Sequence, residues 1–246
     1  MILSALDIGS RLTKRVDFKD DKIINTSLLD TAVFYKNIND FIKKNQDISL
    51  YMTGYGKNNL QFGNKELKTF TTPELKAHFI GAKQQTGLKD FILLDIGGQD
   101  TKVIKVENSR MVDFRTNEKC AAASGRYLEN MSSILGIENI GKYFESPVKL
   151  SSTCAVFGES EVIGLLSNGI SISEIAAGVN KSLFLRVSKL IIPLYSENTP
   201  IVFCGGLYSN IAIRSFLVDE FKCDLIIPDF PIHNGAIGAF WAKYIK

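Results

Sequence analysis

An internal repeat constrains the fold of this 246-residue chain more than any other feature of its sequence. The segments LSALDIGSRLTKRVDF and FILLDIGGQDTKVIKV align as two copies of one unit. Asp7 then matches Asp95 and Lys14 matches Lys102, with the same separation in both cases (95 − 7 = 102 − 14 = 88). Each copy has the pattern of an apolar strand, an Asp-Ile-Gly turn and a second strand. The repeat predicts two lobes of similar topology that face each other.

The rest of the pattern predicts an α/β chain that becomes mostly helical after the second copy. Strands are predicted over 22–29, 49–56 and 224–229, and from residue 200 to the Gly205-Gly206 pair. Helices are predicted over 31–44, 74–85, 120–136, 157–169, 173–191, 210–221 and 235–246, with Ser173 opening one and Gly136 and Gly169 closing two others. We expect an N-terminal lobe over 1–90, a C-terminal lobe over 91–233, and a final helix over 234–246 that packs back on the first lobe.

The composition is that of an ordinary globular protein, with 45% apolar and 22% charged residues. The net charge, 29 − 26 = +3, is weak, and basic residues do not cluster with aromatics, so neither nucleic acid nor a membrane is expected as a partner. The opening MILSALDIGS lacks the basic region of a signal peptide, and no run of about 18 apolar residues occurs. We therefore expect a cytoplasmic chain.

The glycine turns of the two copies suit the binding of a nucleoside triphosphate. Glycines let backbone N–H groups approach phosphate oxygens, and an aspartate at a strand end can hold Mg²⁺ through water or position an attacking water. Ser10 and Thr101 add hydroxyl donors, and Lys14 is a candidate phosphate contact. Gly205 and Gly206 would let a flat adenosine ring lie close to a strand end. A single DIGS is only a strand followed by a turn, and neither GxxxxGK[ST] nor GxGxxG is present, so this prediction depends on the duplication.

A cysteine stands where a helix is predicted to begin, in the segment NEKCAAASGRYLENMS. Unpartnered N–H groups at a helix start favour the thiolate, which ligates metals or attacks electrophiles. The alternative is that Cys120 is a small buried residue, as most free cysteines are. Four cysteines are few for a disulfide scaffold. Cys204 and Cys223 are expected to be packing residues, and His78 and His233 have no evident ligand partner.

The two hairpins and the Gly-Gly turn resemble those of the actin, hexokinase and Hsp70 ATPase superfamily. Four longer strings, DIGGQDTK, NEKCAAASGRYLE, CAVFGESEVIGLL and GAIGA, are similar to one branch of it. This branch is the BadF/BadG/BcrA/BcrD-type ATPases, in particular the activators of 2-hydroxyacyl-CoA dehydratases. The similarity covers nearly the whole chain, including TGYGK and ELKAHFIGA. It implies an α/β, duplicated actin/hexokinase-like (ribonuclease H-like) ATPase fold with two lobes around a nucleotide cleft.

The same resemblance implies an iron–sulfur centre. In that family each subunit contributes two cysteines to one 4Fe-4S cluster on the dimer axis, and the matching positions here are Cys120 and Cys154. Such a cluster normally takes four thiolates, which an isologous homodimer supplies. The implied activity is ATP-dependent electron transfer, in which hydrolysis changes the angle between the lobes and a low-potential electron passes to an iron–sulfur dehydratase or reductase. A ferredoxin or flavodoxin would be the electron donor.

The motif match also assigns roles to the residues of the hairpins. Asp7 and Asp95 would hold Mg²⁺ and position water, while Gln99 or Asp100 would orient the attacking water. Contacts to ATP or ADP are expected from the phosphate-facing residues Gly9, Ser10, Lys14, Gly97, Gly98 and Thr101 and from Gly205 and Gly206 beside the adenosine. The family usually has a small hydroxyl residue where this chain has Arg11, and a bulky cation there would change the turn or add charge near the phosphates.

Two other functions fit the same fold. A small-molecule kinase predicts a substrate-binding insertion with a catalytic aspartate, and an actin-like assembly protein predicts nucleotide binding with polymer formation. Neither function needs Cys120 and Cys154. A bound iron–sulfur cluster would therefore separate the activator from both alternatives.

Overall fold

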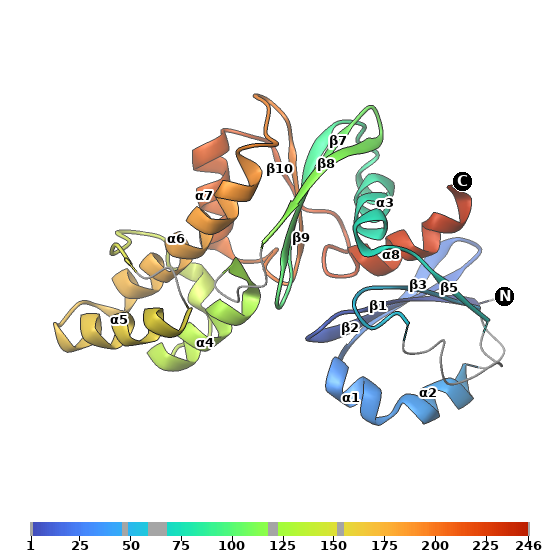
Figure 1. Ribbon diagram of the computed structural model, residues 1–246, viewed down its shortest axis with the longest axis horizontal. Coiled ribbons are helices and arrows are strands. Elements are labelled where there is room, and N and C mark those ends of the chain that lie inside the picture. The colour runs from blue at the N-terminus through green and yellow to red at the C-terminus, as the bar shows by residue number, and fades with distance from the viewer. Residues whose placement is uncertain (1, 46–48, 59–67, 118–122, 152–154, 246) are drawn as a thin grey trace. The chain divides into compact units, whose positions relative to one another are not determined.

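The structure is a computed structural model that describes residues 2–45, 49–58, 68–117, 123–151 and 155–245 (Figure 1). The chain divides into two compact units. The first comprises Met1–Lys89, Ser109–Met111 and Pro228–Lys246, and the second comprises Asp90–Asn108 and Val112–Ile227. Two five-stranded sheets account for the described strands.

The first sheet contains β1 (Ile2–Ile8), β2 (Leu12–Lys19), β3 (Lys22–Asp30), β4 (Ser49–Thr53) and β5 (Lys68–Thr71) in the order β3-β2-β1-β4-β5. The pairs β1–β2 and β2–β3 are antiparallel, whereas β1–β4 and β4–β5 are parallel. Successive side chains of a strand point to opposite faces, so β1 supplies two cores. Leu6 and Ile8 pack with Phe34 and Ile42, while Ala5 joins a separate cluster.

The helices of the first unit are α1 (Thr31–Lys36), α2 (Ile38–Lys44), α3 (Glu74–Thr86) and α8 (Asn234–Trp241), followed by the 3₁₀ turn η3 (Ala242–Tyr244). Helix α8 packs against α3 and against strands β1 and β4. Its Phe240 ring stacks on Phe18 of β2, with ring centroids 3.6 Å apart. The C-terminal helix therefore completes the core of the N-terminal sheet.

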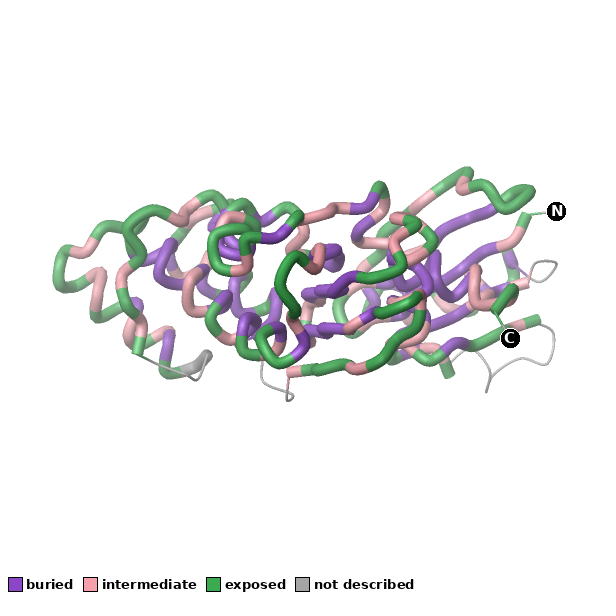
Figure 2. The backbone as a smooth tube through the Cα atoms, turned by 90° about the horizontal axis from the view of Figure 1, so that it is seen from above, coloured by how far each residue is buried: buried purple, intermediate pink, exposed green. Residues whose placement is uncertain are grey.

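The second sheet contains β6 (Phe91–Ile96), β7 (Thr101–Glu107), β8 (Arg110–Thr116), β9 (Ile201–Gly205) and β10 (Leu225–Ile226) in the order β10-β9-β6-β7-β8. Read from the other edge, the order β8-β7-β6-β9-β10 matches β3-β2-β1-β4-β5 strand for strand. The helices of this unit are α4 (Gly125–Leu135), α5 (Ala155–Ser167), α6 (Ile172–Ile191) and α7 (Ile211–Phe221), with the 3₁₀ turn η2 (Ile140–Lys142). The largest apolar cluster joins β6, β7 and β9 to α4, α6 and α7. Figure 2 shows how far each described residue along the chain is buried.

The 88-residue repeat holds in three dimensions beyond the two Asp-Ile-Gly strands. The turn between β2 and β3 has positive φ at Asp20 and Asp21, and the turn between β7 and β8 has positive φ at Asn108 and Ser109. These are the same positions of the repeat (108 − 20 = 109 − 21 = 88). Positive φ at both central residues is typical of tight hairpins, so each copy comprises three strands.

Most predicted elements are confirmed, with a few differences. The predicted helix 31–44 is two helices, because Asn37 interrupts it and its side chain amide donates to the Val33 carbonyl at 3.0 Å. Helix α6 is opened by Ser171 through a capping box with Glu174, not by Ser173. Strands β5 and β8 were not predicted. The described part of the helix predicted over 120–136 begins at Gly125 and ends, as expected, at Gly136. Among the described residues, none of the helices combines the length and apolar character needed to cross a bilayer.

Candidate functional site

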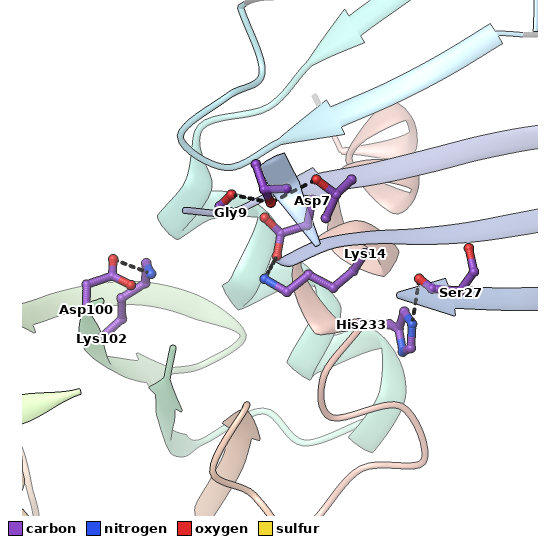
Figure 3. Close-up of polar contacts among 9 residues, drawn as sticks. Asp7, Gly9, Lys14, Ser27, Asp100, Lys102 and His233 are labelled. Carbon is purple, nitrogen blue, oxygen red and sulfur yellow. Dashed lines mark hydrogen bonds and ion pairs between the residues drawn. The ribbon is translucent and has the colours of Figure 1, made fainter. Parts of the chain in front are cut away.

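The first copy of the repeat places Asp7 near the end of β1, opposite Lys14 of β2. The Asp7 side chain is 2% exposed, and Lys14 Nζ lies 3.0 Å from its Oδ2 atom (Figure 3). A buried carboxylate is costly unless it is paired and hydrogen-bonded, and this lysine provides one charged partner. The pair stands beside the glycine turn, although the sequence analysis expected Lys14 to contact phosphate and did not predict its bond to Asp7.

Two glycines bring backbone close to the Asp7 carboxylate. A Cβ atom at Gly54, which has φ +87°, would lie 2.6 Å from Oδ1, and one at Gly235 would lie 2.9 Å from Oδ2. Side chains are therefore excluded on both sides of this carboxylate. Gly54 belongs to the TGYGK string after β4, and Gly235 belongs to the GAIGA string of α8. Each of the two strings thus supplies a glycine that leaves room for the Asp7 carboxylate.

The turn that follows Asp7, Gly9–Arg11, is fixed from two sides. The Gly9 amide donates to the Leu12 carbonyl at 3.2 Å, and the Gly9 carbonyl accepts the hydroxyl of Thr31 at 2.8 Å. Ser10 at the tip of the turn is exposed. Arg11 Nη1 forms an ion pair of 2.7 Å with Asp30, the residue that caps α1. The bulky Arg11 side chain at the end of the turn therefore contacts the start of α1.

One histidine lies close to Asp7 and a second is within reach of its charge, which the sequence did not indicate. A Cβ atom at Gly235 would lie 3.0 Å from Nε2 of the buried His78, as well as close to Asp7. The His233 ring hydrogen-bonds the Ser27 carbonyl at 3.3 Å. Burial lowers the pKa of His233, and the Lys14 charge adds to this, while Ser27 and Asp7 oppose it. These residues come together because α3 packs on α8. The two helices are far apart in the sequence, so no local sequence pattern predicts this contact.

The second copy places Asp95 on β6, opposite both Lys102 of β7 and Cys204 of β9. Asp95 is 4% exposed. Lys102, whose side chain is 6% exposed, donates to Oδ2 of Asp100 at 2.6 Å (Figure 3). The lysine of the second copy therefore contacts a carboxylate of the turn itself.

The turn after Asp95, Gly97–Asp100, has the same closing hydrogen bond as the first turn. The Gly97 amide donates to the Asp100 carbonyl at 2.8 Å. Gly97 and Gly98 are partly buried, whereas Gln99 is exposed. Water can therefore reach Gln99, as a side chain that orients water requires.

Thr101 is placed differently from the other expected phosphate contacts. Its side chain is fully buried, and its hydroxyl donates to the Ala123 carbonyl at 2.5 Å. Its backbone amide donates to Oδ1 of Asn117 at 2.7 Å, and its carbonyl accepts the Asn117 amide at 3.1 Å. The Thr101 hydroxyl therefore donates its hydrogen to the backbone of the second unit in this structure.

The Gly-Gly pair ends β9 next to β6. Gly205 has φ +88°, and a Cβ atom there would lie 2.4 Å from the Ile96 carbonyl oxygen, so only glycine fits this approach. Gly206 is exposed, and a Cβ atom there would have its nearest neighbour at 3.9 Å. Cys204 beside them is fully buried, and burial together with the Asp95 charge raises the pKa of its thiol well above the ordinary value. Cys204 and the buried Cys223 are packing residues, as predicted.

Cys120 and Cys154 lie outside the described residues, which resume at Ala123 and Ala155 on their C-terminal sides. Within the described ranges, none of the groupings of histidine, cysteine, aspartate and glutamate has three members placed to hold a metal ion. Magnesium is usually held by one or two carboxylates together with substrate phosphates, and Asp7 and Asp95 are of that chemistry. The buried carboxylates and the glycine turns fit Mg²⁺ and a nucleotide.

Two sheets of matching strand order, each with a buried aspartate on its first antiparallel strand and a glycine turn after it, define an actin/hexokinase-like ATPase fold. MreB5 of Spiroplasma citri bound to ADP shares this fold, with a TM-score of 0.62 at 17% identity over 99% of this chain and 97% of that chain.

The chain belongs to the BadF/BadG/BcrA/BcrD ATPase family, which it matches over residues 7–242. It is 32% identical to the 2-hydroxyisocaproyl-CoA dehydratase activator of Clostridioides difficile, over 97% of this chain and 93% of that protein. The structure of that activator with bound ADPNP superimposes with a TM-score of 0.83, covering 100% of this chain and 98% of that one. Component A of the Acidaminococcus fermentans (R)-2-hydroxyglutaryl-CoA dehydratase, at 33% identity, gives a TM-score of 0.84 over 97% of this chain and 96% of that one.

Proposed function

We propose that this chain is an ATP-hydrolysing activator that delivers a low-potential electron to a partner dehydratase or reductase. The family and the two activators similar to it over almost their whole length support this proposal. The observation that carries it is the pair of buried aspartates, Asp7 and Asp95, each followed by a glycine turn. Carboxylates and glycine turns of this kind can hold Mg²⁺ and phosphate oxygens, and catalysis of phosphoryl transfer is mainly positioning and charge neutralisation.

The nucleotide site is proposed from residues of both copies. Asp7 and Asp95 hold Mg²⁺ and position water, and Gln99 or Asp100 orients the water that attacks. The phosphates meet the turn residues Gly9, Ser10, Gly97 and Gly98 and the amine of Lys14, and the adenosine lies against Gly205 and Gly206. An ammonium group has three donors, so Lys14 can contact Asp7 and a phosphate oxygen at once.

The electron-transfer part of the proposal depends on Cys120 and Cys154. Four thiolates, two from each chain of a homodimer, are the usual ligand set of a 4Fe-4S cluster. The cluster would supply one-electron chemistry, with a ferredoxin or flavodoxin as the donor. Asn117 and Ala123, which flank the segment of Cys120, both hydrogen-bond Thr101 at the start of β7.

The test is anaerobic purification of the full chain and of three cysteine variants. We expect about four iron atoms per two chains and absorbance near 400 nm in the wild type. Both signals should be lost in Cys120→Ala and Cys154→Ala and kept in Cys204→Ala, because Cys204 is a buried packing residue. A wild type without iron that still hydrolyses ATP would favour a kinase or an assembly protein, and full iron retention in both Cys120→Ala and Cys154→Ala would exclude these ligands.

A further inference from the structure

A fully buried asparagine lies in the middle of α6, a helix that belongs to the largest apolar cluster of the second unit. A buried amide costs stability unless its hydrogen bonds are made, so its partners indicate why it is there. The Nδ2 atom of Asn180 donates to the carbonyls of Ile140 at 2.8 Å, Tyr143 at 2.9 Å and Ala176 at 3.1 Å. Asn180 therefore fixes both ends of the η2 turn to α6.

The oxygen of Asn180 is bonded to a second asparagine, at the start of α7. Asn210 Nδ2 donates to Asn180 Oδ1 at 3.1 Å, while Asn210 Oδ1 caps α7 by accepting the Ile213 amide at 2.9 Å. A Cβ atom at Gly141 would lie 2.9 Å from Asn210 Cγ, so the η2 backbone packs directly against this side chain. Helices α6 and α7 pack side by side (Figure 1). One buried polar network thus joins η2, α6 and α7.

Asn210 is also the last residue of the turn that follows β9. The Tyr208 amide donates to the Gly205 carbonyl at 3.3 Å, and the Asn210 amide donates to the Leu207 carbonyl at 2.9 Å. At its first residue the turn is held by the close approach of Gly205 to Ile96 of β6. At its last residue it is held by the bond between the two asparagines. The four residues between these ends are exposed or half-buried.

We infer that Asn180 is a positioning residue for the adenosine of the bound nucleotide and that it acts through Asn210. The inference rests on the proposed function, because it takes Gly205 and Gly206 as the residues against which the adenosine lies. A flat ring can lie close to this turn only while the turn backbone keeps its path. Without the bond to Asn180, the last residue of the turn would still cap α7 but would lose its attachment to α6. The network therefore acts on the nucleoside part of the ligand, whereas the phosphates are proposed to meet other turns.

The test compares the binding of ADP and of inorganic pyrophosphate, each with Mg²⁺, to the full-length chain by titration calorimetry. Pyrophosphate carries the two phosphates of ADP without the adenosine. Asn210→Ser keeps a side-chain oxygen that can cap α7 but removes the donor to Asn180. We expect the Kd for ADP to rise about fivefold, the factor that one hydrogen bond corresponds to, and the Kd for pyrophosphate to stay unchanged.

Two further variants test the route from Asn180. Asn180→Ala should weaken ADP binding at least as much as Asn210→Ser, and the double variant should bind ADP no more weakly than Asn180→Ala alone. Ser171→Ala is the matched control, because it removes the exposed capping bond at the start of the same helix, α6. It should leave both Kd values unchanged. If Asn180→Ala does not fold, Asn210→Ser and the control still decide.

Hydrogen exchange gives a readout that does not depend on ligand binding. Without nucleotide, the backbone amides of residues 207–210 should exchange faster in Asn210→Ser and Asn180→Ala than in the wild type, because the turn opens more often. Ser171→Ala should exchange like the wild type at these residues.

The inference would be overturned by unchanged ADP binding in Asn210→Ser, by an equal loss of pyrophosphate binding in that variant, or by an equal loss of ADP binding in Ser171→Ala. A wild type that binds pyrophosphate as tightly as ADP would overturn it as well, because the adenosine would then contribute nothing. A wild type that binds neither ligand fails the proposed function, and hydrogen exchange then decides whether Asn180 holds the turn.

Discussion

Replacing Lys14 with methionine removes the cation that contacts the buried Asp7 carboxylate while keeping an unbranched apolar side chain in its place. Asp7 is 2% exposed and Lys14 is 20% exposed, so the carboxylate would lose a charged partner in a nearly dry site. Breaking a buried pair from one side typically costs about 3–5 kcal/mol. Because the lysine is partly exposed, we expect the lower end, about 3 kcal/mol, or a fall in Tm of about 6–12 °C for a chain of this size.

The assay is urea unfolding without nucleotide, followed by the fluorescence of Trp241. This is the only tryptophan of the chain, and it lies in α8 of the unit that holds Lys14. Asp7→Asn and the double variant complete a mutant cycle, in which we expect a coupling of about 2 kcal/mol. Arg11→Met is the control in the same unit, because Arg11 pairs at 2.7 Å with Asp30, the two side chains are 43% and 37% exposed, and the loss should be no more than about 1 kcal/mol. Equal losses for Lys14→Met and Arg11→Met, or an additive double variant, would refute the reasoning.

Three further variants test stability. Gly54→Ala should destabilise the first unit by at least about 2 kcal/mol, because the new Cβ would lie 2.6 Å from Asp7 at a left-handed φ of +87°. At Gly164, on the exposed side of α5, a new Cβ would meet no atom within 4 Å, so Gly164→Ala should stabilise the chain by about 0.5–1 kcal/mol. Chemical unfolding of both variants tests whether the available space and φ determine if a Gly→Ala change raises or lowers the free energy of unfolding. The Asp17→Asn variant should lose less stability than the wild type when the pH is lowered. Burial raises the pKa of Asp17, but bonds from Ser4, Arg15 and Asn25 and the Arg15 charge bring it below the ordinary value. A depressed carboxyl pKa gives stability that is present above about pH 4 and lost as pH falls through the folded-state value, so identical acid unfolding profiles of Asp17→Asn and wild type would contradict it.

The sequence predicted the parts of the fold that repeat or that have strong local signals. The spacing between Asp7 and Asp95 identified two sheets of one topology, and the Gly136 and Gly169 stops were correct, since both glycines have positive φ. Strand β5 was missed because it is a short edge strand of four residues, three of them polar, and β8 because most of its side chains are exposed. Neither has the apolar run by which a strand is recognised.

The candidate site shows the same division. The hairpin that places Asp7 opposite Lys14 was predicted from its strand, turn and strand pattern, but the ion pair between them was not. The approach of His78 and Gly235 to Asp7 depends on helices that meet only after folding, α3 and α8. The buried hydroxyl bond of Thr101 likewise joins strand β7 to Ala123, more than twenty residues away in the chain. The motif match, which suggested Thr101 as a phosphate contact, does not record this bond.

One position of the repeat accounts for a difference between the two hairpins. The residue that closes the turn is Leu12 in the first copy and Asp100 in the second, 88 residues later, and the closing backbone bond is the same in both. A leucine offers no acceptor beside Lys14, whose amine contacts Asp7 of β1. An aspartate offers a carboxylate beside Lys102, and the amine contacts it at 2.6 Å. The first hairpin therefore pairs its lysine with the buried carboxylate of the strand, whereas the second pairs its lysine with the half-exposed carboxylate of the turn. One substitution at the closing position of the turn is thus enough to redirect the amine, although the backbone bond that closes the turn is unchanged.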